Sequence, residues 1–331
     1  MSQRTASSRL TEAWRRRGPL ACALWPVSAL MGGIVALRRL AYRQGWLSAR
    51  RLPVPVLVVG NRIAGGAGKT PTTIALLHHL RTQGWTPGVL SRGYGAPERP
   101  PEPLLLDAQS AARVSAAQCG DEPLLIWRRT GVPLMIGPDR APCGEALLGA
   151  HPDIDILVCD DGLQHLRLQR DVEVIVFDER GAGNGWLLPA GPLREPWDSA
   201  PTPGLVAPPL VLYNAPRATT PLPGHLLRPS LGQPVPLADW WRGEAHLAHP
   251  LLPEHGSPKA SVWALAGIAQ PQRFFGALAQ QGFAVQPLPL PDHTDFATLP
   301  WPESVRDLIV TEKDAVKLRP ERLAAERPHT R

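Results

Sequence analysis

Short apolar runs alternate with glycine- and proline-rich stretches along most of the chain. A β-branched run at 54–59 predicts a buried strand, and residues 70–80 have the pattern of a helix that follows it. A second mostly apolar run, at 154–159, predicts another buried strand. Near the C-terminus, residues 261–266 and 271–280 again give a strand and then a helix. Because alternating strands and helices are typical of α/β folds, we expect a mainly parallel sheet with helices on both faces.

The longest uncharged run lies near the N-terminus, at residues 18–37, between arginines at 15–17 and at 38–39. A membrane span needs about 20 apolar residues, but Pro26 and Gly32 dilute this run. A membrane-associated helix that lies at the interface, with its arginines on anionic lipid, fits at least as well. A true span and a buried core helix with solvated arginines are the alternatives.

The basic charge of the chain is concentrated in this N-terminal part. Residues 1–51 hold ten arginines and one acid, so their formal net charge is +9. The rest of the chain carries −3, which gives the total of +6. A nucleic-acid-binding protein needs a basic patch on its folded body, so the distribution argues against nucleic acid as a partner. The cysteines show no CxxC pairing, which indicates a reducing, cytosol-facing compartment for Cys22, Cys119, Cys143 and Cys159.

A glycine-rich loop connects the first predicted strand to its helix. A glycine-rich loop between a strand and a helix lets backbone N–H groups converge on phosphate oxygens at the helix N-terminus. Lys69 would supply charge to the β- and γ-phosphates of ATP, and Thr70 a hydroxyl to Mg²⁺. The usual GxxxxGK[ST] pattern has glycine where this chain has Ile63, so the match is to the GGxGKT variant of the P-loop. The alternative is a turn without a ligand. The candidate nucleotide-binding residues are Asn61, Ala64, Gly65, Gly66, Ala67, Gly68, Lys69 and Thr70.

Two aspartates end the second predicted strand, since Asp160 and Asp161 directly follow the run at 154–159. Carboxylates at the carboxyl end of a parallel strand point into the crevice where a P-loop enzyme binds Mg²⁺. The two side chains face different directions if the strand continues. We therefore expect one of them on Mg²⁺, together with Thr70, and the other on water, a loop or the substrate. A solvated Asp-Asp-Gly turn is the alternative.

Other segments carry residues that each have two possible roles. Asp121 precedes an apolar segment and is either a helix N-cap or a functional carboxylate. His293 lies between carboxylates, which can suit its pKa to proton transfer, or it is a surface histidine. Arg92 and Tyr94 either reach a substrate phosphate or belong to a plain turn. The glycine- and proline-rich segment 183–196 indicates an ordered functional loop, because Leu and Trp residues can pin it down.

Taken together, these segments resemble the tetraacyldisaccharide 4′-kinase family of the lipid A pathway, from the N-terminal helix to Leu318. The segments that occur in the order of the family are 61–71, 91–95, 120–123, 160–165, 188–196, 266–268, 292–293 and 311–317. The resemblance implies transfer of the γ-phosphate of ATP, with Mg²⁺, to the 4′-hydroxyl of tetraacyldisaccharide 1-phosphate, the lipid A disaccharide, giving lipid IVA. It also implies a location on the cytoplasmic face of the inner membrane.

The resemblance assigns roles to particular residues. In the family, the positions of Asp121 and His293 form a pair that acts on the sugar hydroxyl. We therefore expect Asp121 to accept the hydroxyl proton while His293 orients or tunes it. Lys69, with Mg²⁺ on Thr70 and Asp160, would hold the phosphates in line. The expected partners are the lipid substrate and the membrane surface, and we expect a monomer. Further candidates for metal, nucleotide or substrate contacts are Asp161, Arg92, Tyr94, Gln164 and His165.

The expected organisation has four parts: a membrane-associated helical segment at 1–50, a P-loop kinase core at 51–210, a variable linker at 211–258 and a smaller α/β lobe at 259–331. If His293 lies on that lobe and Asp121 on the core, closure of the two would assemble the catalytic pair around the substrate.

Three other classes of protein fit the sequence less well. A nucleotide-driven switch or partitioning ATPase shares the GGxGKT loop, but it usually has lysine where this chain has Ala64. A GTPase metallochaperone needs N-K-x-D to select guanine, whereas Lys313 here stands directly beside Asp314. A non-enzymatic membrane scaffold gives no use for Lys69.

Overall fold

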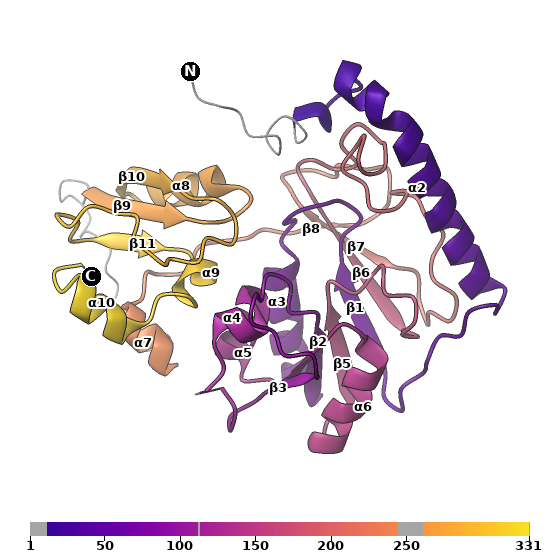
Figure 1. The fold of residues 1–331 in the computed structure, drawn as a ribbon, viewed down its shortest axis with the longest axis horizontal. Helices are drawn as coiled ribbons and strands as arrows, with labels where there is room; N and C mark the ends of the chain where they lie inside the picture. The colour runs from indigo at the N-terminus through magenta and orange to yellow at the C-terminus, as the bar shows by residue number, and fades with distance from the viewer. Residues whose placement is uncertain (1–11, 112, 244–260, 331) are drawn as a thin grey trace. The chain divides into compact units, whose positions relative to one another are not determined.

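The computed structural model describes residues 12–111, 113–243 and 261–330. Its contacts divide them into two compact units (Figure 1). Unit 1 takes the described residues up to Arg92 together with Pro133–Arg228, and unit 2 takes Gly93–Val132 together with those from Pro229 onward. The predicted four-part organisation stays a prediction. The compact units follow other boundaries, because residues 93–132 pack with the C-terminal part of the chain. Residues 1–11, 112, 244–260 and 331 of the predicted parts lie outside the described residues.

Unit 1 is built on a parallel sheet. Its strands follow one another in the order β4-β2-β5-β1-β6-β7-β8. They are β1 Val56–Gly60, β2 Pro87–Ser91, β4 Leu134–Ile136, β5 Ile156–Asp160, β6 Val172–Asp178, β7 Leu210–Asn214 and β8 His225–Leu226. The central strands β1 and β5 are buried along their whole length, which explains why they read as continuous apolar runs rather than alternating ones. The expectation of a mainly parallel sheet is confirmed.

Helices pack on this sheet and place the glycine loop. Helix α3, Lys69–Thr82, packs against β1, β2 and β5, and helix α6, Arg140–Ala150, packs against β2 and β4. Strands β1 and β5 are paired in a register that sets Val59 opposite Asp160. Because both strands run in the same direction, their carboxyl ends meet at one edge of the sheet.

Helix α2, Pro19–Arg43, packs on unit 1 along one of its faces. Hydroxyl Oγ of Ser28 donates to the carbonyl of Leu187 and accepts from the amide of Ala190, both at 2.8 Å. A β-carbon at Gly32 would lie 3.2 Å from the side chain of Leu187, so a small residue lets the helix approach. Farther along the helix, the guanidinium of Arg39 pairs with the carboxylate of Glu195 in the same unit. The buried face therefore carries small and polar side chains.

The opposite face of α2 is apolar and exposed. Leu30, Ile34 and Leu37, spaced as one helical face, are 68%, 55% and 61% exposed. Among the described residues, α2 is the one helix long and apolar enough to cross a membrane, and only 11% of its most apolar stretch is buried. The alternative of a buried core helix is therefore wrong.

Unit 2 contains a second, smaller parallel sheet with strand order β10-β9-β11. These strands are β9 Ser261–Ala266, β10 Ala284–Pro289 and β11 Leu308–Val310. The predicted strand and helix at 261–266 and 271–280 are confirmed. Val262, Phe275 and Phe283 form part of its core. The other elements of unit 2 are β3 Leu104–Leu106, α4 Ala116–Cys119, α5 Asp121–Thr130, α7 Leu237–Arg242, α8 Pro271–Gln280, α9 Glu312–Ala315 and α10 Pro320–Glu326.

Candidate active site

The glycine loop of unit 1 runs from the end of β1 to the start of α3. Gly65 and Gly68 have φ angles of 85° and 94°, in the left-handed region that L side chains rarely adopt. A β-carbon at Gly68 would also lie 2.5 Å from the amide nitrogen of Asn214. Lys69 and Thr70 open the helix and are buried. The loop therefore has the strand, turn and helix N-terminus that phosphate binding requires.

The first half of the loop is held by the segment 192–194. The amide of Ala64 donates to the carbonyl of Pro192 at 2.7 Å, and Ile63 forms an isolated bridge with Leu193. Ile63 is completely buried, so the position that is glycine in the usual pattern holds a core side chain here. Asn61 closes the loop from within, since its Nδ2 donates to the carbonyl of Gly65 at 3.0 Å.

Two residues that the sequence analysis missed also hold the loop. Arg180 donates from Nη1 to the carbonyl of Ala64 at 3.0 Å and from Nη2 to that of Gly66 at 3.1 Å. Its guanidinium is itself paired with the buried Asp178, at 2.8 Å. Asn214 donates to the carbonyl of Ala67 at 3.2 Å. The signal that could have found both residues is their place at the ends of β6 and β7, the edge where the loop lies.

The two aspartates at the end of β5 have different partners. Asp160 is buried and accepts a 2.8 Å hydrogen bond from Oγ1 of Thr73, in the first turns of α3. Asp161 has a φ of 50° and faces the other way. Its Oδ1 lies 3.1 Å from Nη1 of Arg194 and its Oδ2 lies 3.6 Å from Nζ of Lys69. Burial raises the pKa of Asp161, but the charges of Lys69 and Arg194 outweigh this effect, so the pKa lies below its ordinary value.

The donor set near the loop suits Mg²⁺. Mg²⁺ binds hard oxygen ligands and takes only one or two carboxylates from the protein, because water and phosphate oxygens complete its shell. The hydroxyl of Thr70 and the carboxylate of Asp160 are ligands of this kind. Among the described residues there is no group of three or more His, Cys, Asp and Glu that could hold a metal by itself. The residues present therefore fit a metal that arrives with a phosphate ligand.

Gln164 and His165, predicted to contact the substrate, brace the loop that follows β5. Gln164 donates to the carbonyl of Asn61 at 3.2 Å and to Oε1 of Glu195 at 2.9 Å. Nε2 of His165 accepts from the amide of Arg140 at 3.2 Å and lies 3.3 Å from Oδ1 of Asp139. Burial and the charge of Arg140 lower the pKa of His165 to about 4, so its imidazole is neutral at pH 7. Their role toward a substrate stays a prediction.

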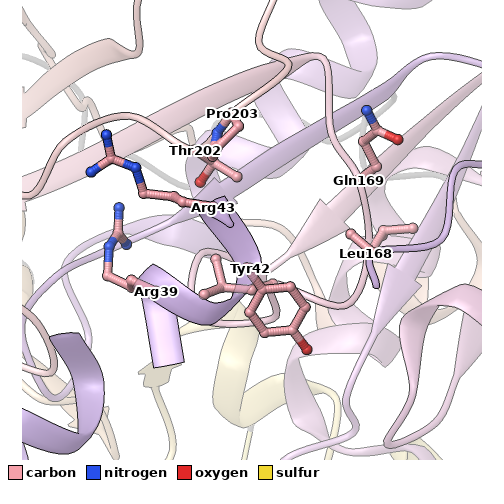
Figure 2. A pocket seen from close by; sticks show the side chains of 9 residues that line it. Arg39, Tyr42, Arg43, Leu168, Gln169, Thr202 and Pro203 are labelled. Carbon is pink, nitrogen blue, oxygen red and sulfur yellow. The ribbon is translucent and has the colours of Figure 1, made fainter. Parts of the chain in front are cut away.

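A small cavity lies elsewhere in unit 1, at the end of α2 (Figure 2). It has a volume of about 180 Å³, and its lining includes Arg39, Tyr42 and Arg43. Arg39 is already paired with Glu195 at 2.6 Å. The residues that line this cavity are not those of the phosphate loop.

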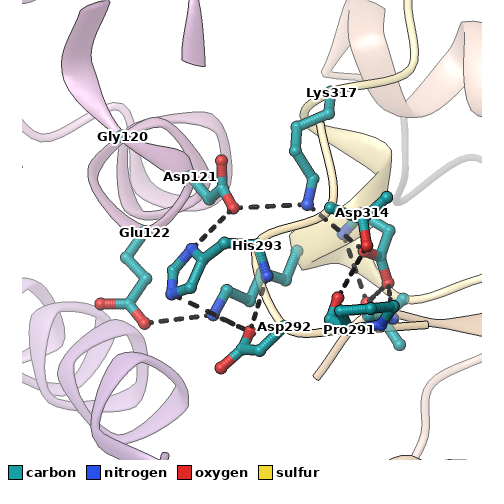
Figure 3. A network of polar contacts seen from close by, with 12 residues as sticks. Gly120, Asp121, Glu122, Pro291, Asp292, His293, Asp314 and Lys317 are labelled. Carbon is teal, nitrogen blue, oxygen red and sulfur yellow. Dashed lines mark hydrogen bonds and ion pairs between the residues drawn. The ribbon is translucent and has the colours of Figure 1, made fainter. Parts of the chain in front are cut away.

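Asp121 lies in unit 2, as the first residue of α5. The interpretation of Asp121 as an N-cap is wrong, because the N-cap is Gly120 and the side chain of Asp121 does not cap the helix. Instead, Oδ2 of Asp121 lies 3.2 Å from Nδ1 of His293 (Figure 3). Gly120 has a φ of 93°, and a β-carbon there would lie 2.9 Å from the carbonyl of Tyr94. Glycine at this position therefore lets the start of α5 lie close to the backbone of Tyr94.

The predicted pair of Asp121 and His293 is thus brought together, but within a single compact unit. Both residues belong to unit 2, so the expectation that closure of two lobes assembles the pair is wrong. His293 itself has a φ of 61°, which is uncommon for a residue other than glycine and often marks functional sites. The ring of Tyr94 meets the imidazole edge-on, with ring centroids 5.7 Å apart. Arg92, the last residue of its part of unit 1, is exposed after β2.

The electrostatics of the pair keep Asp121 ionised. Burial raises the pKa of Asp121, but the hydrogen bond with His293 and the charges of Lys317 and Lys313 outweigh it, so the pKa lies below its ordinary value. Lys313 is mainly engaged elsewhere, 2.9 Å from Asp292. A buried, ionised carboxylate that contacts an imidazole can accept a proton from a hydroxyl group.

Comparison with known proteins shows the family of the chain. The family model described as tetraacyldisaccharide-1-P 4′-kinase matches residues 20–329. A tetraacyldisaccharide 4′-kinase of Leptothrix cholodnii is 56% identical over 325 residues, which cover 98% of this chain and 90% of that protein. One of Methylibium petroleiphilum is 56% identical over 323 residues, covering 97% and 87%. The crystal structure of LpxK from Aquifex aeolicus in complex with ATP has a TM-score of 0.74 and 26% identity, covering 91% of each chain. The chain therefore belongs to the tetraacyldisaccharide 4′-kinase family.

Proposed function

We propose that this chain transfers the γ-phosphate of ATP to the 4′-hydroxyl of tetraacyldisaccharide 1-phosphate. The observation that carries the proposal is a complete P-loop, with Lys69 and Thr70 at a helix N-terminus and the buried Asp160 on the adjacent strand. It occurs in a chain whose relatives at 56% identity are named as this kinase. The solved relative binds ATP.

The proposed mechanism assigns the ATP phosphates and the acceptor hydroxyl to different residues. In unit 1, Lys69 and the loop amides hold the phosphates and stabilise their charge, which is most of what phosphoryl transfer needs from a protein. Thr70 and Asp160 would hold Mg²⁺, and that ion would neutralise charge on the phosphates. In unit 2, Asp121 accepts the proton of the acceptor hydroxyl while His293 orients it.

Four residues are proposed to contact the substrate: Arg92, Tyr94, Gln164 and His165. The exposed position of Tyr94, which is 71% exposed beside His293, supports a contact with the acceptor. Arg92 is exposed at the end of β2, where a guanidinium can pair with a phosphate. Gln164 and His165 would act from the loop after β5, where their present contacts fix the backbone.

We further propose that α2 lies on the cytoplasmic face of the inner membrane and does not span it, and that the protein acts as a monomer. The exposed apolar face supports membrane contact, because apolar side chains enter the boundary of a bilayer. The contacts of the other face oppose a span. They extend from Ser28 to the ion pair of Arg39 with Glu195, and a spanning α2 would carry that pair toward the hydrocarbon.

The experiment that tests the proposal is incubation with γ-labelled ATP, Mg²⁺ and tetraacyldisaccharide 1-phosphate in detergent micelles, followed by location of the label on the lipid. We expect label at the 4′ position with the wild type. Lys69→Ala should transfer phosphate at least about 100-fold more slowly, because a charge that stabilises the transition state is lost. Arg217→Ala, which changes an exposed residue of the same unit, is the matched control. A wild type that folds and binds ATP but labels no lipid contradicts the proposal.

A further inference from the structure

Lys317 is a buried cation beside the catalytic pair, and none of the roles given above requires it. It follows α9, and its side chain is 7% exposed. Its Nζ lies 3.4 Å from Oδ2 of Asp121 and 3.5 Å from Oδ1 of Asp314 (Figure 3). Within the described part of the chain the ammonium has no partner that meets the geometry of a hydrogen bond. A buried ammonium is costly unless it is paired, so its two carboxylate neighbours account for its presence.

One of these neighbours is rigidly anchored. Asp314 is completely buried, and its Oδ2 accepts from the amide of Gly267 at 2.9 Å and from Oγ1 of Thr311 at 2.6 Å. Thr311 is also the N-cap of α9 and accepts from the amide of Asp314. The anchored Asp314 therefore holds the ammonium of Lys317 in place beside Asp121. The ring of Phe296, with its centroid 5.1 Å from the ammonium, supports the same position.

The other neighbour, Asp121, uses a single oxygen for both of its partners. Nδ1 of His293 and Nζ of Lys317 both contact Oδ2. Among the residues drawn in Figure 3, Oδ1 of Asp121 has no such contact. Two partners on one oxygen hold that oxygen in place and leave the second oxygen to accept a hydroxyl proton.

We propose that Lys317 is a positioning residue that holds Asp121 ionised and oriented toward the acceptor hydroxyl. The proposal rests on the proposed function, in which Asp121 is the base. A desolvated carboxylate without a cation takes up a proton and can no longer accept one from the substrate. Phosphoryl transfer passes through a loose transition state, so the base has to be ionised and in place more than it has to be strong.

The other charged groups around Asp121 do not replace Lys317. On the helix of Asp121, a carboxylate oxygen of Glu122 lies 3.5 Å from Nζ of Lys313. In the loop at 291–293, a carboxylate oxygen of Asp292 lies 2.9 Å from the same Nζ. Cys119 of α4 is neutral at pH 7, because burial raises its pKa to about 12. His293 and Asp314 complete the set. Of the two lysines around α9, Lys317 is therefore the one that is paired with Asp121.

The test is the pH profile of kcat/KM for transfer to the lipid, measured for Lys317→Met and Lys317→Arg. An opposite charge at this distance lowers a carboxylate pKa by about 1 to 3 units. We therefore expect the acid limb of Lys317→Met to move up by at least about one pH unit, with a roughly 10-fold loss of rate below the limb and a smaller loss above it. Lys317→Arg should keep the wild-type limb. Arg306→Met, at an exposed site of unit 2, is the matched control.

Several outcomes separate this inference from the proposed function. A Lys317→Met profile parallel to that of the wild type overturns the inference, whether the rate falls uniformly or not at all. If Lys317→Met does not fold, Lys317→Gln keeps a donor without the charge and should give the same shifted limb. Asp121→Asn decides the function: full activity in that variant removes Asp121 as the base. Loss of transfer in Asp121→Asn with a parallel Lys317→Met profile overturns the role of Lys317 alone.

Discussion

Nζ of Lys69 lies 3.6 Å from Oδ2 of Asp161, so the lysine of the phosphate loop has a carboxylate partner at the end of the neighbouring strand β5. The adjacent Asp160 has no part in that pair and contacts Thr73 instead. The two aspartates therefore have separable roles. Asp161 pairs with the cations of the site, and Asp160 contacts the start of α3, where Thr70 lies.

This separation predicts different responses to Mg²⁺. We expect Asp160→Asn to raise the Mg²⁺ concentration for half-maximal transfer by about 10-fold or more, the range seen when a metal site loses a supporting group. Asp161→Asn should change it much less, because Asp161 faces Lys69 and Arg194. The measurement is the initial rate of lipid labelling against Mg²⁺ concentration. The reverse order of the two variants would assign the metal to Asp161.

Arg180 predicts a change in nucleotide affinity. Arg180→Ala removes the hydrogen bonds to the carbonyls of Ala64 and Gly66. Hydrogen bonds from charged groups contribute about 1.5–3 kcal/mol each, so we expect ATP to bind at least about 10-fold more weakly. The variant should also unfold at lower urea concentration, since the buried Asp178 loses its ion pair with Arg180. Binding is measured by titration calorimetry, with Arg217→Ala as control, and an unchanged ATP affinity would contradict the role of Arg180.

The parts of the site that could be predicted are those encoded locally. Lys69 and Thr70 belong to one short motif, and Asp160 ends an apolar run, so each was predicted from its neighbours in the sequence. The pairing of Asp121 with His293 spans 172 positions and was predicted only through the resemblance to a family. The structure brings the two residues together at 3.2 Å but in one compact unit, which the chain order did not indicate.

Other contributions could not be predicted, because they depend on long-range contacts of ordinary residues. Arg180 contacts the loop across more than 110 positions. Its place after β6 indicates the edge of the sheet where it lies, but that its partners are loop carbonyls depends on the fold. Lys317 lies in a segment that resembles the family, but its direction toward Asp121 depends on the fold. The hydrogen bonds of Ser28 to Leu187 and Ala190 likewise join residues about 160 positions apart.

His165 predicts a pH dependence of stability. Its pKa is about 4 in the folded protein, against about 6.5 in an unfolded chain. Between these values the unfolded state binds more protons, so the free energy of unfolding decreases as the pH falls from about 6.5 toward 4. We expect His165→Gln to flatten this dependence, measured by urea denaturation at several pH values. His225→Gln, at an exposed site of the same unit, should leave it unchanged. An equally steep dependence in His165→Gln would contradict this prediction.

The exposed face of α2 predicts how the protein associates with membranes. Replacing Leu30, Ile34 and Leu37 together with serine removes apolar side chains that are more than half exposed. We expect binding to anionic lipid vesicles to fall by about 10-fold or more, since burial contributes about 25 cal/mol per Å² of apolar surface. Stability in urea should not change. Val206→Ser, at a residue that is 74% exposed, is the control. If the triple variant bound vesicles as well as the wild type does, the exposed face of α2 would not be the membrane contact.

The central claim is that the chain transfers phosphate from ATP to a lipid hydroxyl, with Lys69 acting on the phosphates and Asp121 as the base. The most direct test is a single-turnover experiment with γ-labelled ATP, Mg²⁺ and tetraacyldisaccharide 1-phosphate, in which ATP binding and lipid labelling are followed together. For Asp121→Asn we predict ATP binding like that of the wild type and a rate of labelling at least about 100-fold lower, the lower end of the 10²–10⁴ that a general base contributes. Labelling at the wild-type rate by Asp121→Asn would contradict the claim.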